Sequence, residues 1–256
     1  MIARSVWRTA NLYPGSAFGK LVRLPLRLVP PNTEIPILAG PLRGLKWISD
    51  SSNATCWMGV YESAKQQAFA RIVKPGDVVF DLGANVGFYT LLASRLVGKA
   101  GRVFAFEPSP RNVWYLRRHL QINAIKNCEV SAAAVWSQRG IARFEISALP
   151  VTGHITNEIS SAGYEVETVS LDGLLSEGLV SEPTVIKCDI EGGEFVALLG
   201  ARRTLLKCKP VILLATHGPE VHQRSCELLK ELGYRLGSLV HGQDLRTTDE
   251  VIAEPI

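Results

Sequence analysis

The stretch Val78-Val79-Phe80-Asp81-Leu82-Gly83-Ala84-Asn85-Val86-Gly87-Phe88-Tyr89-Thr90 decides the fold of this 256-residue chain. Its β-branched and aromatic start predicts a buried strand. Gly83 and Gly87 predict a tight turn that a ligand can approach closely, and a helix is expected after them. Asp81 comes at the carboxyl end of the strand, where open parallel sheets bind their ligands. We therefore expect its carboxylate to project into a cofactor crevice.

A second acid, Glu107, ends the next predicted strand, residues 102–106. An acid about 20 residues after a glycine turn is placed to accept hydrogen bonds from ribose hydroxyls. The third glycine of a dinucleotide fingerprint is missing, because Phe88 occupies its position. Asp81 would repel a pyrophosphate, but it suits the ammonium group of S-adenosylmethionine. We predict S-adenosylmethionine as the cofactor, with NAD or a turn that holds no ligand as the alternatives.

The rest of the chain alternates predicted strands and helices without internal repeats, a pattern typical of a doubly wound α/β sheet. Further core strands are expected at 128–133, 184–190 and 210–215, and antiparallel edge strands at 234–240 and 245–252. A short hairpin is predicted for 35–47, with its turn at Gly40-Pro41. Residues 147–165 are rich in Ser, Thr, Gly and Asn and predict a long polar loop, a frequent form of lid.

Composition narrows the class of protein. The cysteines are five in number and form no C-x-x-C pair, which indicates a reducing compartment rather than a disulfide framework or a metal site. No apolar stretch is long enough to span a bilayer, and the N-terminus has no clean signal core. No basic motif interleaved with aromatic residues supports nucleic-acid binding. We expect a cytoplasmic protein with no nucleic-acid partner, and the sequence does not indicate its oligomeric state.

The positive charge is concentrated near the N-terminus. Residues 1–46 hold seven basic residues and one acid, whereas the remaining chain is slightly acidic. The alternation of apolar and basic residues in 21–28 suggests weak peripheral contact of residues 1–30 with an anionic membrane surface. Pro25 interrupts a helix there and favours a solvated or partly packed extension. We expect residues 1–54 to form a basic extension with the hairpin, and residues 55–256 to form the main domain.

Several motifs follow one another in a set order through about residues 55–235. They are Trp57-x-Gly59-x-Tyr61-Glu62, Asp81-Leu82-Gly83-Ala84-Asn85-Val86-Gly87, Phe106-Glu107-Pro108, Asn123, Ala133-Ala134-Val135, Leu171-Asp172, Lys187-Cys188-Asp189-Ile190-Glu191-Gly192-Gly193-Glu194, Leu199-Gly200-Ala201 and Pro210. In this combination the chain resembles the FkbM-type S-adenosylmethionine-dependent methyltransferases, a branch of the class I methyltransferase fold. The resemblance implies a doubly wound, mostly parallel seven-stranded sheet. It also implies methyl transfer to a hydroxyl of a small molecule, sugar or natural product.

The resemblance also assigns cofactor residues. Asp81 and Gly83 would line the methionine part, Glu107 would bind the ribose, and the alanines after the third strand would edge the adenine. Glu62 would cover the cofactor from the preceding helix, or else form an ion pair on the helix surface. The expected cofactor-binding residues are Glu62, Asp81, Gly83, Asn85, Gly87, Glu107, Ala133, Ala134 and Asp189.

For catalysis, we expect Asp189 to be the key polar residue of the transfer, with holding the next turn as its alternative role. Glu191 and Glu194 lie near a helix start, which favours carboxylates. Together with Asp189 they have the hard oxygen ligands of a Mg²⁺ site. We favour helix capping and predict no metal ligand. His217 is the first candidate for general base, because imidazole titrates near neutral pH, and His154 on the polar loop is the second.

Two positions depart from the family's pattern. Thr216-His217 ends the fifth strand where the family often has an acid, and His119 stands where an asparagine is usual. The first departure bears on the substrate pocket. Two other functions stay open on the same fold: a catalytically silent module that binds the cofactor or a partner, and methylation of nitrogen or of protein. The tetrapeptide typical of amide or amine methylation, Asn-x-Pro followed by Pro or Tyr, is not evident after the fourth strand.

Overall fold

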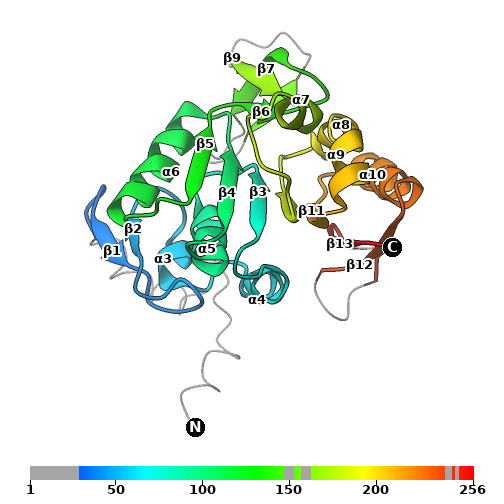
Figure 1. The fold of residues 1–256 in the computed structure, drawn as a ribbon. Coiled ribbons are helices and arrows are strands. Elements are labelled where there is room, and N and C mark those ends of the chain that lie inside the picture. The colour runs from blue at the N-terminus through cyan, green and yellow to red at the C-terminus, as the bar shows by residue number, and fades with distance from the viewer. Residues whose placement is uncertain (1–28, 147–152, 157–162, 240–243, 246–247) are drawn as a thin grey trace.

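Seven strands form the central sheet of the protein. The computed structural model describes residues 29–146, 153–156, 163–239, 244–245 and 248–256, and places these strands in the order β12-β13-β11-β10-β3-β4-β5 (Figure 1). Their bounds are β3 (Val78–Leu82), β4 (Arg102–Phe106), β5 (Cys128–Ser131), β10 (Val185–Cys188), β11 (Val211–Ala215), β12 (Tyr234–Ser238) and β13 (Glu250–Pro255). Strands β3, β4, β5, β10 and β11 run parallel to one another, and β13 is antiparallel to both of its neighbours, β11 and β12. The predicted doubly wound, mostly parallel seven-stranded sheet is confirmed.

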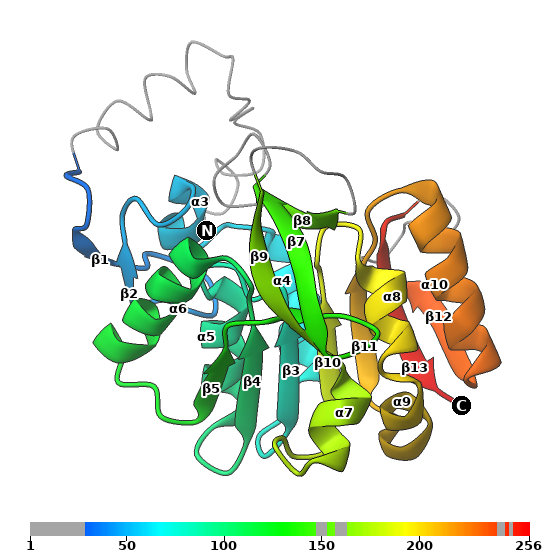
Figure 2. The ribbon, with the colours of Figure 1, turned by 90° about the horizontal axis from the view of Figure 1, so that it is seen from above.

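Side chains of successive strand residues point to opposite faces, so the sheet carries two apolar cores. On one face, Phe80 and Ile186 pack in a cluster with helices α7 to α10, and on the other Val79 and Val185 pack with helices α3 to α6. Figure 2 shows α4 and α5 behind the sheet and α7, α8 and α9 in front of it. The helices are α3 (Ala54–Met58), α4 (Ser63–Ile72), α5 (Phe88–Val97), α6 (Pro110–Ile122), α7 (Leu171–Ser176), α8 (Glu194–Leu199), α9 (Arg202–Cys208) and α10 (Pro219–Glu231).

The last strand does not lie at the edge where the sequence placed it. β13 is inserted between β11 and β12, with hydrogen-bonded partners on both sides. Val251 and Ala253 of this strand have no exposed surface. The sequence pattern could not separate an edge strand from an interior one here, because the alternation of apolar residues is the same in both.

A second sheet stands beside the carboxyl ends of the central strands. Its order is β6-β9-β7-β8, with bounds β6 (Ala134–Val135), β7 (Gly140–Ile146), β8 (Gly153–Thr156) and β9 (Gly163–Val169). Phe144 and Val166 pack on Ala134 in a small apolar cluster of their own. The prediction of one polar loop over 147–165 is therefore wrong for β8 and for the start of β9. The remaining residues of that segment lie outside the described part of the chain.

The predicted hairpin is present with shorter strands. β1 (Glu34–Pro36) pairs with β2 (Lys46–Ile48) in antiparallel register, and residues 37–45 connect them. Ile37, Leu42 and Trp47 belong to the core cluster on the α3–α6 face of the sheet. The predicted boundary between residues 1–54 and 55–256 stays a prediction. The basic stretch at 1–28, with its proposed membrane contact, lies outside the described residues, and none of the described helices is both long and apolar enough to span a bilayer.

Candidate active site

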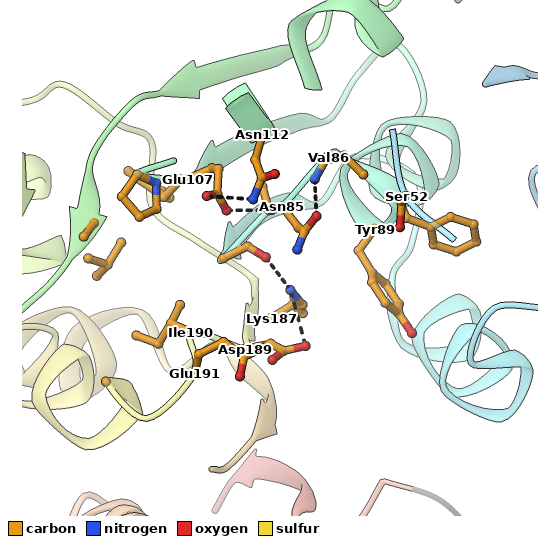
Figure 3. Close-up of a pocket in the computed structure, with 18 of the residues that line it drawn as sticks. Ser52, Asn85, Val86, Tyr89, Glu107, Asn112, Lys187, Asp189, Ile190 and Glu191 are labelled. Atoms are coloured by element: carbon orange, nitrogen blue, oxygen red, sulfur yellow. Dashed lines mark hydrogen bonds and ion pairs between the residues drawn. The ribbon is translucent and has the colours of Figure 1, made fainter. Parts of the chain in front are cut away.

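A cavity of about 280 Å³ opens at the carboxyl ends of β3, β4 and β10, the edge at which the sequence predicts a ligand (Figure 3). Parallel strands end together at this edge, so residues far apart in the sequence meet there. Among the predicted cofactor residues, those that line the cavity are Gly83, Asn85, Glu107, Ala134 and Asp189. Those that do not line it are Glu62, Asp81, Gly87 and Ala133.

The turn after β3 is shaped by two glycines with different tasks. At Gly83 φ is +75°, and a Cβ added there would lie 1.9 Å from the carbonyl oxygen of Asp189. A side chain is excluded, so the turn runs directly against the end of β10 beside the cavity. At Gly87 φ is +99°, and an added Cβ would lie 2.5 Å from Leu116 Cδ1. Gly87 therefore lets helices α5 and α6 approach, and its role is in packing rather than in the cavity wall.

Glu107 reaches the cavity from the end of β4 and is held by three donors. The amide of Asn85 donates to Oε2 (2.8 Å), and the amide of Ser109 (2.9 Å) and Nδ2 of Asn112 (3.3 Å) donate to Oε1. Burial raises the pKa of the Glu107 carboxyl, and these hydrogen bonds oppose the rise. A carboxylate offers about four lone-pair sites, so roughly one remains for a ligand hydroxyl. Asn112, which lies in the first turn of α6, was not among the predicted site residues.

The prediction that Asp81 projects into the crevice is wrong in its geometry. The side chain of Asp81 is 1% exposed, its Oδ1 lies 3.2 Å from Nζ of Lys187, and its Oδ2 accepts a hydrogen bond from Thr90 (2.6 Å). Lys187 does line the cavity, and its Nζ donates to the carbonyl oxygen of Gly83 (2.9 Å). Asp81 and Lys187 are direct partners in the register of β3 and β10, which places both on the α5 face. Asp81 thus acts on the cavity through Lys187.

Lys187 is the most informative residue that the sequence analysis passed over. Burial opposes its charge, but the carboxylates of Asp81 and Asp189 outweigh burial and raise the pKa of Lys187. Figure 3 shows Lys187 and Asp189 pointing toward one another, with Nζ 3.9 Å from Oδ2. The available signal was a lysine inside the apolar strand Val185-Ile186-Lys187-Cys188, since a buried cation requires a carboxylate partner.

Glu62 does not line the cavity, but it contacts a residue that does. Its Oε2 accepts a hydrogen bond from the hydroxyl of Tyr89 (2.9 Å), which does line the cavity, and its Oε1 pairs with Lys65 (2.7 Å). Lys65 also pairs with Glu250 of β13 (2.5 Å). Burial and the neighbouring Glu62 carboxylate raise the pKa of Tyr89, so its hydroxyl remains a donor. Both earlier interpretations of Glu62 are thus partly met, because it forms an ion pair and also positions a cavity residue.

An apolar wall completes the cavity. Val135, Trp136 and Phe144 line it from the small sheet, and Ile190 lines it from the turn after β10. A Cβ added at Gly193 would lie 2.9 Å from Cζ3 of Trp136, so this glycine lets the indole close on the turn. Apolar surface of this kind suits a nucleobase and excludes water from its surroundings. Its origin in two different sheets explains why no local sequence pattern revealed it.

Four ionisable side chains gather where β10 and β11 end. Nδ1 of His217 lies 2.9 Å from Oε1 of Glu194, and Nε2 lies 3.7 Å from Oδ1 of Asp189 and 3.6 Å from Oε2 of Glu191. The hydrogen bond to Glu194 is the largest influence that raises the pKa of His217, which reaches about 9 although burial opposes the rise. With no metal ion bound, the ring in this arrangement carries its proton at neutral pH. This environment disfavours His217 as general base.

Two other sequence expectations concern this region. Glu194 has no exposed surface, and its Oε1 accepts hydrogen bonds from the amides of Ile190 (3.2 Å) and Gly192 (3.0 Å) at the start of α8. These hydrogen bonds fix the turn that precedes α8, but no side chain caps the first turn of that helix in the described structure, so the favoured capping role is not confirmed. His154 lies in strand β8, and its side chain is outside the described part of the structure. Its role as second base candidate stays a prediction.

Comparison with known proteins identifies a matching family. The model described as the methyltransferase FkbM domain matches residues 81–236. The hexuronic acid methyltransferase AglP of Haloferax volcanii is 31% identical over 138 residues, covering 54% of this chain and 55% of that protein. The 31-O-demethyl-FK506 methyltransferase FkbM of Streptomyces tacrolimicus is 30% identical over 158 residues, covering 50% of this chain and 60% of that protein. The chain thus spans little more than half the length of these relatives.

Among solved structures, the chain resembles a methyltransferase FkbM from Methylobacillus flagellatus. The TM-score is 0.50 at 19% sequence identity, and the match covers 79% of this chain and 55% of that one. At this identity the likeness concerns the fold, and it agrees with the strand order described above.

Proposed function

The chain belongs to the FkbM methyltransferase family, whose methyl donor is S-adenosylmethionine, and on this premise we propose that it methylates a hydroxyl group of a small molecule, sugar or natural product. Family membership confirms the predicted resemblance and the predicted cofactor. The choice of oxygen as the acceptor atom, and the class of acceptor, are the proposal. The names of the relatives AglP and FkbM, one a methyltransferase of a hexuronic acid and the other of a demethylated natural product, support it.

The observation that carries the proposal is the arrangement of carboxylates around one cavity. Glu107 lies at the end of β4, Asp189 lies beyond the end of β10, and the Gly83 turn runs between them. When bound, the cofactor supplies an electrophilic methyl group on a cationic sulfur. A cavity with acids at both ends and an apolar wall suits a ligand that combines ribose hydroxyls, an adenine and positive charge. The residues present therefore fit S-adenosylmethionine.

Each part of the chain then has a defined task. Glu107 accepts a hydrogen bond from the ribose with its remaining lone pair, and Ala134 and Trp136 border the adenine. Lys187 holds the carbonyl oxygen of Gly83 and so maintains the shape of the turn against which the methionine part lies. Tyr89, held by Glu62, closes the same end. Methyl transfer depends mainly on alignment, which is worth on the order of 7–11 kcal/mol of barrier, so rigid support of this kind is what the protein contributes.

Asp189 is the proposed contact for the acceptor hydroxyl. Its side chain is 27% exposed and lines the cavity, unlike that of Asp81. His217 has one nitrogen engaged by Glu194 and the other facing two carboxylates, so we assign it the positioning of Asp189 and Glu191 rather than proton removal. Asp189→Asn should reduce methyl transfer about 10²–10⁴-fold, which is more than it weakens cofactor binding, because the carboxylate is proposed to orient or deprotonate the acceptor.

The test is methyl transfer from S-adenosylmethionine labelled in its methyl group. The full chain is incubated with uronic acids, neutral sugars, hydroxylated macrocycles, amines and peptides, and labelled products are analysed by mass spectrometry. Label on a hydroxyl is expected. Label confined to amines or peptides would replace the proposal with nitrogen methylation. Binding of S-adenosylhomocysteine without transfer to any acceptor would instead favour a silent module, and displacement of that ligand by NAD would contradict the cofactor assignment.

A further inference from the structure

We propose that Asp189, Glu191 and His217 form a binding site for one divalent metal ion beside the cofactor cavity. Asp189 and Glu191 follow β10 and line that cavity, and His217 follows β11. One ligand atom from each of these three side chains lies within 4.8 Å of the others. The sequence alone offers three carboxylates, Asp189, Glu191 and Glu194, as hard oxygen ligands. The structure replaces Glu194 in that set with a histidine from the neighbouring strand.

The spacing of the ligand atoms suits a common ion. Nε2 of His217 lies 3.7 Å from Oδ1 of Asp189 and 3.6 Å from Oε2 of Glu191. Imidazole nitrogen and carboxylate oxygen bind divalent ions at about 2.0–2.2 Å, and two ligands at that distance with an angle of about 120° between them are about 3.6 Å apart. The three side chains would thus need only small adjustments to reach one ion. Part of the coordination sphere would remain open toward the cavity.

Glu194 supplies an independent sign that a cation belongs here. Its carboxylate has no exposed surface, and its Oε2 has no hydrogen-bond partner within the described part of the chain. Its Oε1 is fixed by two backbone amides and faces Nδ1 of His217. An ionised carboxylate only accepts hydrogen bonds, so Nδ1 carries the hydrogen. In the neutral ring the lone pair of Nε2 then points toward two more carboxylates.

That arrangement is repulsive unless a positive charge lies between Nε2 and the carboxylates. A proton on Nε2 is one solution, and a metal ion bound by all three side chains is the other. A buried carboxylate on the far nitrogen is the usual support of a metal-binding histidine, because it fixes the tautomer and the ring orientation. Among the described lysines, Lys187 lies 3.9 Å from Asp189, but its Nζ is shared with the buried carboxylate of Asp81 and with the carbonyl oxygen of Gly83. The geometry and the charge together favour the ion.

The ligand set indicates the kind of ion. Two carboxylates favour hard ions such as Mg²⁺ and Mn²⁺, and one imidazole favours Mn²⁺ or Zn²⁺ over Mg²⁺. Mn²⁺ satisfies both preferences and can be detected directly by its electron paramagnetic resonance. If the proposed function is correct, the open positions face the acceptor, where the ion would bind the hydroxyl and favour its deprotonation. The binding site does not depend on that role.

The experiment is a titration of the full chain, cleared of metals with EDTA, with Mn²⁺ while the resonance of the free ion is recorded. One bound ion per chain is expected. His217→Ala and the isosteric Glu191→Gln should each weaken binding at least tenfold, and Glu194→Gln should weaken it about 10–100-fold through loss of the histidine's support. Glu182→Gln is the matched control, because Glu182 is an exposed carboxylate that pairs with Lys207 away from the site. It should leave the affinity unchanged.

Three results would overturn the proposal. They are the absence of a stoichiometric Mn²⁺ site, an affinity unchanged in His217→Ala, and release of Mn²⁺ when S-adenosylhomocysteine saturates the cavity, since the ion and the cofactor are proposed to lie side by side. Calorimetry with S-adenosylhomocysteine on the same samples is measured separately. Loss of cofactor binding with an intact Mn²⁺ site would count against the proposed function and not against the metal site.

Discussion

Lys187 and Asp81 show how a buried ion pair prepares this cavity. Both lie on the α5 face of the sheet, and Asp189, two residues after Lys187, lies farther from its Nζ (3.9 Å) than Asp81 does (3.2 Å). Their pairing fixes Nζ of Lys187 within hydrogen-bond distance of the Gly83 carbonyl oxygen. A pair of this kind contributes little net stability, because desolvation of both charges offsets their attraction. Its effect is to define one position for the glycine turn.

Removing one partner should therefore be costly. Lys187→Met leaves the Asp81 carboxylate buried without its cation, and we expect a loss of about 3–5 kcal/mol in the free energy of unfolding. The double variant Asp81→Asn with Lys187→Met should recover most of that loss, because no unpaired charge remains. Urea unfolding of both variants measures this. A single variant that loses less than about 1 kcal/mol would show that water or another cation already compensates Asp81.

Glu107 carries the prediction for cofactor affinity. Glu107→Gln removes the charge from the acceptor of the ribose hydroxyl, and a hydrogen bond to a charged group is worth about 1.5–3 kcal/mol. We expect S-adenosylhomocysteine to bind about 10–100-fold more weakly in calorimetry. The control is Glu129→Gln, an exposed carboxylate on β5 that pairs with Arg102. Equal affinity in the Glu107 variant, with its unfolding midpoint preserved, would remove the ribose assignment.

The hairpin of β1 and β2 is joined to the cofactor turn by His119 of α6. Its Nε2 accepts a hydrogen bond from the amide of Ile48 (3.0 Å), and Nδ1 lies 2.7 Å from the carbonyl oxygen of Val86 and donates to it. The ring stacks on Trp47, with centroids 3.9 Å apart. These contacts use both nitrogens of a neutral imidazole. The departure from asparagine at this position therefore serves to dock one element on another.

This docking predicts a pH dependence of stability. Burial lowers the pKa of His119 to about 4 from its ordinary 6.5, although the hydrogen bond to Val86 opposes the shift. The unfolded chain then binds the proton more readily than the folded one. The contribution is fully present above pH 6.5 and is lost as the pH falls toward 4, by about 3 kcal/mol in total.

Urea unfolding between pH 7.5 and 4 measures this effect against His119→Gln, which offers a donor and an acceptor but does not titrate. The variant should show a smaller fall in stability over that interval, by about the stated amount. Identical slopes in the two proteins would mean that the imidazole is protonated equally in the folded and unfolded chains.

At the scale of the whole molecule, the residues that line the cavity and the basic residues near the N-terminus lie in different parts of the chain. The lining residues fall between positions 52 and 193, whereas most of the basic residues in the first 46 positions precede residue 29. The hairpin that follows packs into the core beneath α5 and α6. We propose that the basic residues before position 29 bind an anionic membrane surface, and that the remaining chain binds the cofactor.

Deletion of residues 1–28 tests this division. The shortened chain should bind S-adenosylhomocysteine within about twofold of the full chain in calorimetry, because no cavity-lining residue is removed. Sedimentation with vesicles containing phosphatidylserine should retain the full chain and lose the shortened one, with release of the full chain at high salt. Equal sedimentation of both proteins would assign any membrane contact to the remaining surface.

Local patterns in the sequence were sufficient to predict the parallel core, the glycine turn and the two acids at strand ends. Strand and helix periodicity, the φ requirement of Gly83 and the position of Glu107 after β4 are all properties of short segments. The family motifs added the cofactor and the number of strands in a mostly parallel sheet. These expectations succeeded because each depends on neighbours in sequence or on a rule of chain topology.

Such local patterns could not predict which side chains from separate strands would pair. Asp81 proved to be buried against Lys187, His217 proved to be held by Glu194, and β13 proved to be an interior strand. In each case two or more segments distant in sequence meet, and their separation and burial set the charge that each side chain carries. Electrostatic energy depends on distance and solvent access, and both arise only when the chain has folded.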